Sequence, residues 1–412
     1  MPDPPLKSPW EPTLDLDHRA VFEVEHAGEF LDALPSRPAV ALVEPRAELA
    51  GARPLLLRTA DLRRRLRLLF GPPDPASRRI NLREYAAAIR FRLAGSIFEQ
   101  SLVHWQQALA LWPDTYRHKL RLHPAPLVKL SLANAYPRAY ITRRIGASGV
   151  HFGPFASRRS AETFLEPFLD LFRMRRCQIK IRRDPDFPGC IYSEMKMCLA
   201  PCFAGCTPEE YAGEVRRVGD FLASRGASFA AELAREREEA SAQTDFERAA
   251  AAHRRLEKVD AVLRLMPELV RCLDSLDAIV LQRAAENSSI AVFVVRAGRI
   301  ADPFSLRFSE LASQPRSVER ILRDQLEPSS STGGTATNES DSGPEAARHV
   351  GGDDWTNAKR EDHLSILAQW FYGRPRQGEI FMGDAQAKKW PYRRILRGCS
   401  RLLAIKAPES KT

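Results

Sequence analysis

The sequence has 412 residues and a formal net charge of +10, with 62 Lys and Arg residues against 52 Asp and Glu. A chain of this length exceeds one small core, so we expect two or three domains, and its charge favours an anionic partner. No run of about 20 apolar residues occurs, so no membrane span is expected. The Pro-rich, acidic N-terminus has no apolar signal segment, which favours a cytoplasmic protein.

The apolar pattern predicts an α+β multidomain protein that begins with a loosely ordered N-terminus over residues 1–30. Over residues 31–121, short apolar strands alternate with helix-like segments, as expected of a small α/β domain. Within this domain, PLLLR at 54–58 predicts a strand and DLRRRLRLLF at 61–70 predicts an amphipathic helix. Strands and a helix then lead into a Cys-rich loop, and together they make up residues 122–206.

The next part of the chain, residues 207–267, is predicted to be helical, with Thr207 as the first N-cap. A small C-terminal α/β segment then covers 268–327 and 362–406, and HLSILAQWFYG is expected to be its final helix. The intervening residues 328–361 are rich in Ser, Gly and Thr, which predicts a disordered insertion.

Five of the seven cysteines fall within thirty residues, which favours a metal site over disulfides in a protein without an export signal. The candidate ligands are Cys177, Cys190, Cys198 and Cys202. Thiolates without a nearby His suit Zn²⁺ or an iron–sulfur cluster. Because zinc ribbons usually have two short Cys pairs and only one is present here, the spacing favours the cluster. Cys206 is a fifth candidate, and buried thiols that pack as small apolar groups are the alternative.

These cysteines and their flanks resemble the UvrC family, the incision subunit of bacterial nucleotide excision repair. The likeness covers roughly residues 34–395 and rests on YPRAYITRRI, HFGPFASRRSAETFLEPFLDLFRMRRC, CIYSEMKMCLAPC and TPEEYAGEVRRVGDFL. It implies an N-terminal GIY-YIG nuclease domain and a [4Fe–4S] cluster on the four cysteines, with Zn as the alternative. The family's RNase H-like and helix–hairpin–helix domains are not expected, because no matching pattern follows Phe381.

The resemblance also locates the catalytic positions of the GIY-YIG domain, and this sequence departs from the family there. Ala41 and Leu55 occupy the two tyrosine positions, and Leu57 occupies the glycine position. Trp105 stands where the family has a glutamate that binds the catalytic cation, whereas Arg63 is retained. Tryptophan cannot ligate a divalent cation. We therefore expect no incision activity and no catalytic Mg²⁺.

Two other residues near these positions bear on activity. Arg117 replaces the family's asparagine beside Tyr116. Glu99 lies six residues before Trp105 on the same predicted helix and could supply a carboxylate, which would make the chain an active, divergent UvrC/Cho-type endonuclease. Six residues turn a helix by about 600°, so Glu99 is expected to face elsewhere as a solvated residue.

The segment ASAQTDFERAAAAHRRLEKV resembles the family's helical UVR motif, which implies pairing with a related hairpin of a UvrB-like protein. Its predicted contact residues are Phe246, Glu247, Ala249 and Ala250. Two such hairpins could bury each other's apolar faces. The family's usual Arg-Asp pair is replaced here, which removes an acid from the charge pairing. The alternative is an ordinary helical hairpin that packs on its own domain.

Arginines predict a DNA-binding surface, because contacts with phosphates give affinity without reading sequence. The candidates are Arg58, Arg63, Arg64, Arg67, Arg143 and Arg144. A solvated Arg-rich face is the alternative. The sequence thus predicts a UvrC-like repair accessory that binds DNA and a UvrB-like partner without cutting. The alternatives are the divergent nuclease and a cluster-bearing interaction module with no DNA role.

Overall fold

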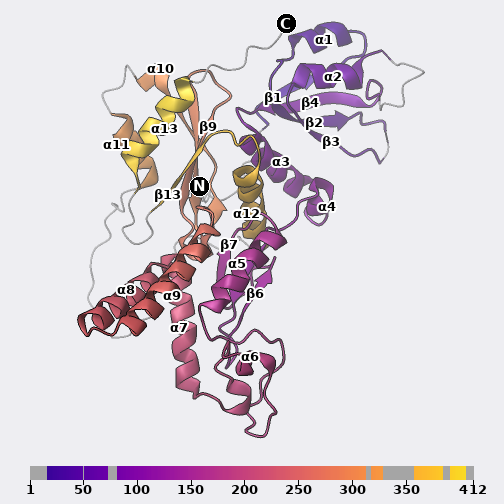
Figure 1. Ribbon diagram of the computed structural model, residues 1–412. Helices are drawn as coiled ribbons and strands as arrows, with labels where there is room; N and C mark the ends of the chain where they lie inside the picture. Colours follow the sequence, from indigo (N-terminus) through magenta and orange to yellow (C-terminus); the bar gives the residue numbers. More distant parts are fainter. Residues whose placement is uncertain are drawn as a thin grey trace, which may run out of the picture.

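The computed structural model describes residues 16–49, 51–72, 81–311, 317–327, 357–383 and 390–404 (Figure 1). It contains both helices and strands, with several small antiparallel sheets, in agreement with the predicted α+β class. Within these ranges, no helix is both long enough and apolar enough to cross a bilayer.

The N-terminal sheet has the strand order β1-β4-β2-β3 and is antiparallel throughout. Its strands are β1 (His18–Val21), β2 (Ala39–Pro45), β3 (Leu55–Thr59) and β4 (Ala86–Leu93). Two helices, α1 (Ala27–Ala33) and α2 (Leu62–Phe70), pack on it around an apolar core. The predicted amphipathic helix corresponds to α2, whose Leu62, Leu66 and Leu69 are buried.

Helix α3 (Ile97–Leu111) connects this sheet to the rest of the molecule, and α4 (Tyr116–Leu120) follows it. On one side of α3, the Gln100 side chain donates to the carbonyl oxygens of Ala39 and Thr59 at 3.2 and 2.6 Å. The other side of α3 joins a central core. Gly95, just before α3, allows a close backbone approach, because a Cβ there would lie 2.1 Å from the Arg283 carbonyl oxygen.

A second antiparallel sheet, of order β6-β5-β7-β8, forms the middle of the chain. Its strands are β5 (Leu127–Leu130), β6 (Ala139–Thr142), β7 (Val150–Gly153) and β8 (Arg271–Cys272). The Cys-rich loop follows α5 (Arg158–Asp170) and contains α6 (Ile191–Glu194) and a short 3-10 turn, η1 (Pro201–Phe203). Strand β8 follows the helices of residues 208–264 in the sequence and pairs with β7, so the chain returns to this sheet after those helices.

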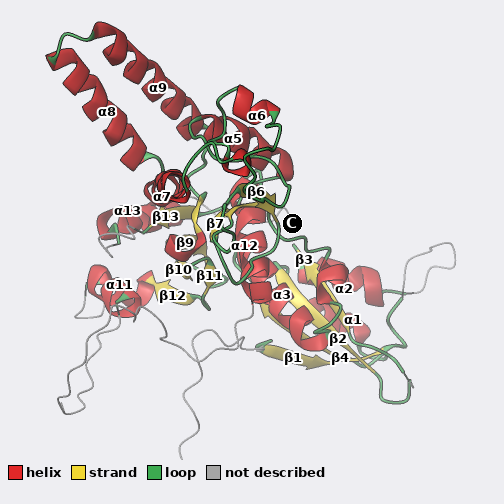
Figure 2. Ribbon diagram, turned by 90° about the horizontal axis from the view of Figure 1, so that it is seen from below, coloured by secondary structure: helices red, strands yellow, loops and turns green. Residues whose placement is uncertain are grey.

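Three helices follow: α7 (Pro208–Ser224), α8 (Ala227–Ala242) and α9 (Phe246–Arg264). Thr207 caps α7 as predicted, in a capping box with Glu210. Helices α8 and α9 form an antiparallel hairpin that projects from the body of the molecule (Figure 2).

The C-terminal sheet has the strand order β11-β10-β9-β13, with β12 also paired to β10. Its strands are β9 (Ala278–Arg283), β10 (Ser289–Arg296), β11 (Arg299–Ile300), β12 (Phe304–Arg307) and β13 (Glu379–Met382), preceded by the 3-10 turn η2 (Leu273–Ser275). Alternate residues of β9 face two different cores. Helix α12 (Asn357–Tyr372) covers one face of this sheet, and α11 (Val318–Leu326) and α13 (Tyr392–Ala404) cover the other. The short helix α10 (Phe308–Leu311) directly follows β12.

Three details differ from the sequence-based prediction. Residues 18–21 of the expected loose N-terminus pair with β4 as strand β1, and α1 begins at Ala27. Residues 328–356 of the expected disordered insertion lie outside the described residues, but 357–361 are the first residues of α12. Helix α12 was expected to be the final helix, which is wrong, because α13 follows it.

Candidate functional site

The positions expected for the nuclease tyrosines lie in the N-terminal sheet and contribute only apolar surface. Ala41 on β2 pairs with Leu57 on β3, and Val43 pairs with Leu55. Ala41 and Leu57 are buried in the core of this unit, and Leu55 is exposed. The sheet therefore places these positions side by side, but none carries a hydroxyl group that could act on a phosphodiester.

The arginines of this unit are partly used in contacts within the protein. Arg63 is half-buried, and its Nε donates to the Leu34 carbonyl oxygen at 2.5 Å. Arg67 pairs with Asp32, and Arg58 donates to the Ser101 hydroxyl at 2.7 Å. Arg64 is exposed, and its side chain has no hydrogen-bond or ion-pair partner among the residues that the structure describes. The predicted patch thus contains engaged arginines, whose side chains bond to other residues, and free arginines, whose side chains have no partner among the described residues.

Trp105, at the position of the expected metal ligand, lies on the side of α3 that faces α12. Its side chain is 2% exposed, and its indole Nε1 donates to Asp362 Oδ2 at 3.2 Å. The indole also meets the His363 ring edge to face, with the centroids 4.6 Å apart. This position therefore belongs to a packed contact between the N-terminal unit and α12.

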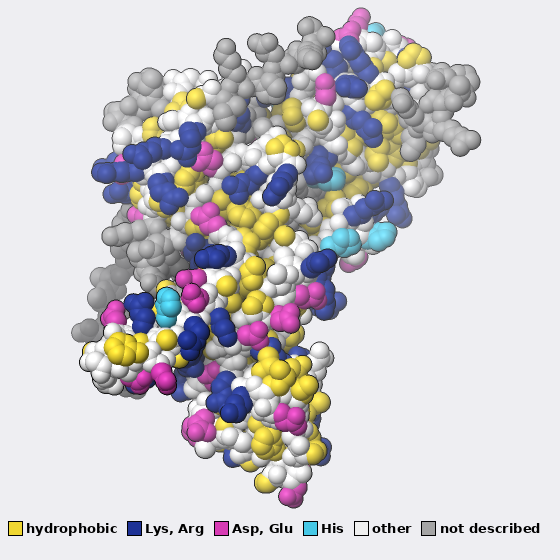
Figure 3. Space-filling model, in the orientation of Figure 1, with side chains coloured by type: hydrophobic (Ala, Val, Ile, Leu, Met, Phe, Trp, Pro, Cys, Tyr) yellow, Lys and Arg dark blue, Asp and Glu magenta, His cyan; other side chains and the backbone are white. Residues whose placement is uncertain are grey.

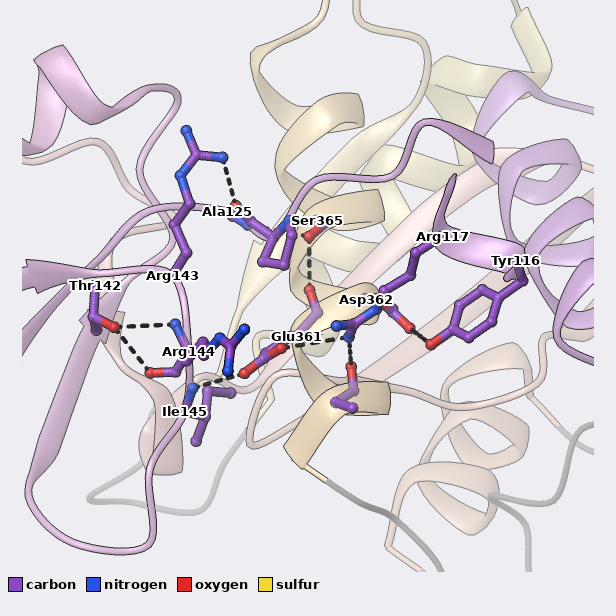
Figure 4. Close-up of polar contacts among 12 residues, drawn as sticks. Tyr116, Arg117, Ala125, Thr142, Arg143, Arg144, Ile145, Glu361, Asp362 and Ser365 are labelled. Carbon is purple, nitrogen blue, oxygen red and sulfur yellow. Dashed lines mark hydrogen bonds and ion pairs between the residues drawn. The ribbon is translucent and has the colours of Figure 1, made fainter. Parts of the chain in front are cut away.

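Asp362 is fully buried and receives three side chains from the N-terminal part of the chain, of which Figure 4 shows Tyr116 and Arg117. Besides Trp105, the Tyr116 hydroxyl donates to it, and Arg117 Nε lies 2.8 Å from its Oδ1. Burial raises the pKa of Asp362, whereas Tyr116 and Arg117 oppose the rise. Burial and the same contact raise the pKa of Tyr116 to about 12, so it stays a hydrogen-bond donor.

Glu361, the preceding residue, connects the same helix to the middle unit. Its Oε1 accepts from the Ile145 backbone N–H at 2.8 Å, and its Oε2 lies 3.4 Å from Arg117 Nη2. One turn later, the Ser365 hydroxyl accepts from the Ala125 backbone N–H at 3.1 Å. Helix α12 thus joins the N-terminal unit to two loops of the middle unit, before β5 at Ala125 and directly after the predicted Arg143-Arg144 pair at Ile145 (Figure 4).

Glu99 was expected to be a solvated residue of α3, which is wrong. Its side chain is buried, and its Oε2 accepts from the Gly95 backbone N–H at 2.8 Å. Arg92 Nη2 lies 4.0 Å from its Oε1. Burial raises the pKa of Glu99, and the Gly95 N–H and Arg92 oppose the rise. The Glu99 carboxylate is therefore bonded to groups at the start of α3, whereas Trp105 on the same helix contacts α12.

The four predicted ligand cysteines lie in the loop between α5 and α7, and all are free thiols. Burial raises the pKa of Cys198 to about 11, and the other three thiols lie close enough to raise it further. Backbone N–H groups point at two of the sulfurs: Ala200 N donates to Cys198 Sγ at 3.3 Å, and the Phe203 N–H donates to the Cys202 sulfur. Such donors suit thiolate ligands. Among the described residues, however, no three potential ligand side chains converge into a metal site.

The UVR-like hairpin is buried at its base and exposed at its tip. Val259 and Val262 of α9 pack in the middle core with Leu233 of α8. At the tip, Phe246 is 73% exposed, Glu247 and Ala250 are also exposed, and Ala249 is half-buried. The base of the hairpin therefore packs on its own domain, and the predicted contact residues lie at the tip, where three of the four are exposed.

Residues 125–221 match the family model described as UvrC/Cho excinuclease, middle domain. The chain is UvrC-like, as the sequence predicted. The matched residues run from the start of β5 through the Cys-rich loop to α7. They include the four candidate cysteines, so the family likeness is established where the sequence signal was most specific.

Curated relatives agree with the family match. The chain is 29% identical over 177 residues to UvrABC system protein C of Ruminiclostridium cellulolyticum, covering 42% of this chain and 29% of that protein. It is 31% identical over 192 residues to the protein of the same name from Chlamydia caviae, covering 45% and 31%. For Methanothermobacter thermautotrophicus the identity is 32% over 202 residues, covering 48% and 33%. The chain thus matches about a third of the length of these relatives. No solved structure matches it.

Sequence reasoning missed the role of Glu361 and Asp362. The available signal was two adjacent acids, followed by a histidine, directly before the mostly apolar run LSILAQWFY. Buried acids are rare unless they are paired, so this pattern could have indicated a buried polar contact. Its partners could not have been identified, because Trp105 and Asp362 are 257 positions apart in the chain.

Proposed function

We propose that this UvrC-like protein takes part in nucleotide excision repair as a protein that binds DNA and a partner and has no incision activity of its own. The observation that carries the proposal is Trp105. It stands at the expected metal-ligand position, and its indole is buried against Asp362 and His363. A hard divalent cation needs oxygen ligands, and this side chain offers none and cannot turn outward without breaking the α12 contact.

The other expected catalytic positions support the same conclusion. Ala41 and Leu57 pair across β2 and β3 within an apolar core. Loss of a single transition-state donor typically lowers an enzyme's rate by about a hundredfold or more. With the tyrosines and the metal ligand all replaced, the retained Arg63 could hold a phosphate but could not activate water. We therefore expect no DNA cleavage when Mg²⁺ is added.

The proposed DNA contacts are the members of the predicted arginine set whose side chains have no partner among the described residues, Arg64 and Arg144, and both are exposed. Arg143 and Arg144 follow β6 beside the α12 contact, but Arg143 Nη1 already donates to the Pro124 carbonyl oxygen at 3.2 Å (Figure 4). Arg58, Arg63 and Arg67 are already bonded within the N-terminal unit. They would have to exchange those bonds for phosphate. DNA affinity should accordingly depend more on Arg64 and Arg144 than on Arg63 and Arg67.

The tip of the α8–α9 hairpin is the proposed contact for a UvrB-like helical hairpin. An exposed aromatic side chain can bury a large area at an interface at little cost in conformational entropy. In a pull-down with the matching UvrB-like protein, Phe246→Ala should weaken binding at least tenfold and leave the melting temperature unchanged. Ala251→Ser on the exposed side of α9 is the matched control. Equal capture by wild type and Phe246→Ala would contradict the assignment.

The four cysteines are the proposed ligands of a [4Fe–4S] cluster, with Zn as the alternative. Support comes from their gathering in one loop and from the N–H groups directed at Cys198 and Cys202. When bound, a cluster would stabilise a loop that has little regular structure. Protein purified anaerobically should be brown and contain iron and sulfide, and Cys198→Ser should lose both. A colourless wild type with stoichiometric zinc would contradict the cluster.

Two competing functions can be separated by direct assays. The divergent-nuclease alternative is motivated by the buried Glu99, whose carboxylate lies on the same helix as Trp105. It predicts cleavage of nicked or lesion-bearing DNA with Mg²⁺ or Mn²⁺, lost in Glu99→Gln; our proposal predicts no cleavage by either protein. The alternative without a DNA role predicts no salt-dependent DNA binding, whereas we expect binding that weakens steeply as salt rises.

A further inference from the structure

A second basic surface lies on α13, a helix that the sequence pattern had not led us to expect. Its sequence, YRRILRGCSRLLA, contains Arg393, Arg394, Arg397 and Arg401 and no acidic residue. The wider segment 388–406 contains seven Lys and Arg residues and no Asp or Glu. A helix of one charge sign either repels its surroundings or meets a partner of opposite sign.

The packing of α13 determines which side faces outward. Ile395, Cys399 and Leu402 are buried against the C-terminal sheet. Gly398 allows this close packing, since a Cβ there would lie 2.6 Å from Cζ of Phe381. The apolar side of α13 is therefore covered by its own domain, and the arginines project from the opposite side. A covered apolar face cannot insert into a lipid surface, which argues against membrane binding as its role.

Three of the four arginines are free to bind a ligand. Arg393, Arg394 and Arg397 are exposed and have no ion-pair or hydrogen-bond partner within the described ranges. Arg401 differs, because its guanidinium makes two bonds to the Glu379 carboxylate. Figure 3 shows Lys and Arg side chains gathered over α11 and α13 on this face.

The nearby acids do not neutralise the three free arginines. On α11, Glu319 lies 3.2 Å from Arg323, one turn along its own helix. Glu327, after α11, accepts from the Tyr392 hydroxyl at 2.7 Å, and because this donor is neutral, Glu327 keeps its negative charge. Neither carboxylate forms an ion pair with Arg393, Arg394 or Arg397. Three arginines against this one uncompensated carboxylate leave a net positive charge along α13.

The spacing of the arginines indicates the kind of partner. Positions three and four apart lie on one side of a helix, with about 5–6 Å between their Cβ atoms. Arg393, Arg394 and Arg397 therefore form an open ridge of fixed charges rather than an enclosed pocket. An open row of guanidinium groups suits a partner with repeated phosphates, each of which can accept two bonds from one arginine.

We propose that α13 binds the phosphate backbone of duplex DNA. This inference rests on the proposed DNA-binding function and adds a second, separate contact to it. Figures 1 and 2 both show α13 well removed from α2, on the far side of the C-terminal sheet from the N-terminal unit. DNA would therefore contact the molecule at two places that belong to different sheets, with affinity but no sequence preference at α13.

The test is fluorescence anisotropy of the full chain with a labelled duplex, repeated over a series of salt concentrations. The variant is Arg393→Gln/Arg394→Gln/Arg397→Gln, because Gln keeps helix propensity and removes the charge. The matched control is Arg235→Gln/Arg254→Gln/Arg264→Gln, which removes the same charge from exposed positions on the α8–α9 hairpin. Circular dichroism verifies that both variants fold.

The α13 variant should bind DNA at least tenfold more weakly at moderate salt. Its plot of log K against log salt should be shallower by about 0.9 for each phosphate that no longer meets an arginine, up to about 2.7 for three. The control should keep the wild-type slope. Among single Arg→Gln variants of α13, Arg401→Gln should weaken DNA binding the least, because Arg401 is already paired with Glu379.

The outcomes separate this inference from the proposed function. A wild type that binds DNA, with an α13 variant of equal affinity and slope, overturns the inference alone. A wild type that does not bind DNA at any salt overturns both. If the α13 substitutions instead abolish binding to vesicles containing phosphatidylglycerol and leave DNA binding intact, the ridge recognises lipid headgroups and the inference is wrong.

Discussion

The contact around α12 and the outer face of α13 use arginine in opposite ways. At α12, Arg117 lies against Asp362 and Glu361, and its charge is balanced by neighbours within the protein. On α13, Arg393, Arg394 and Arg397 face solvent without partners among the described residues. Helix α4, which carries Arg117, and helix α13 are both basic in sequence and contain no acid, so counting arginines does not distinguish them. The difference teaches that a basic stretch predicts binding only where its charges are not already used.

Helix α2 lies between these extremes. Arg63 and Arg67 are bonded to Leu34 and Asp32, whereas Arg64 has no partner among the described residues. The three regions form a series from Arg117, which is engaged, to Arg393, Arg394 and Arg397, which have no partner among the described residues. Substitutions along this series should move from large effects on stability to large effects on DNA binding.

The largest effect on stability is expected at Asp362. Replacing it with Ala removes the shared acceptor of Trp105 and Tyr116 and leaves Arg117 without its buried counter-ion. Breaking a buried pair in this way typically costs about 3 kcal/mol or more. Urea denaturation should show this loss. Asp274→Ala, which removes the exposed partner of Arg360, is the control and should cost at most about 1 kcal/mol. A loss at Asp362 no larger than the control would mean that α12 does not hold the units together.

The next effect is a pH dependence at His363. Burial lowers the pKa of His363 to about 3, and Nδ1 accepts from the Ile300 backbone N–H at 2.7 Å, so the folded protein keeps this ring neutral. The unfolded chain protonates it below about pH 6.5. The stability from the neutral ring is therefore complete above pH 6.5 and decreases as the pH falls toward 3, by up to about 1.4 kcal/mol per unit.

A variant isolates this contribution. His363→Gln keeps a hydrogen-bond acceptor and does not titrate. Its stability measured from pH 7 to 5 should therefore fall less steeply than that of the wild type. His104 and His151, whose pKa values burial also lowers, titrate in both proteins and cancel in the difference. Parallel curves for the two proteins would show that His363 is accessible to protons in the folded state.

The smallest effects concern single arginines. Arg63→Gln should cost about 1 kcal/mol, because it loses a part-buried bond to the Leu34 carbonyl. Arg397→Gln should stay within about 0.5 kcal/mol of the wild type, as expected for an exposed residue without a partner. Thermal denaturation measures both. An Arg397→Gln protein as destabilised as Arg63→Gln would break the comparison between engaged and free arginines.

Much of the local structure could be predicted from the sequence, because its causes are local. The apolar spacing of α2, the capping of α7 by Thr207 and the β9–β10 hairpin all follow from residues within one short segment. Helix α13 was not predicted, although its apolar residues have helical spacing; the expected final helix was placed at α12. The role of α12 could not be predicted, because its partners Trp105 and Ile145 come from distant parts of the chain.

The site residues divide in the same way. The cysteine segment was identifiable because four cysteines at fixed spacing carry the family signature, and the family match includes them. At the expected metal-ligand position, the loss of cation binding could be predicted but the packing of the side chain could not. The sequence shows that Trp105 cannot bind a cation, but only the fold shows that its indole is packed beneath α12.

The central claim is that this protein holds DNA that it does not cut. The most direct test saturates a labelled, lesion-bearing duplex with the full chain, verifies binding by anisotropy, then adds Mg²⁺ or Mn²⁺ and resolves the strands on a denaturing gel. We predict that the bound strands remain intact over hours at a protein excess. Strand cleavage that requires the metal ion and disappears in Glu99→Gln would contradict the account.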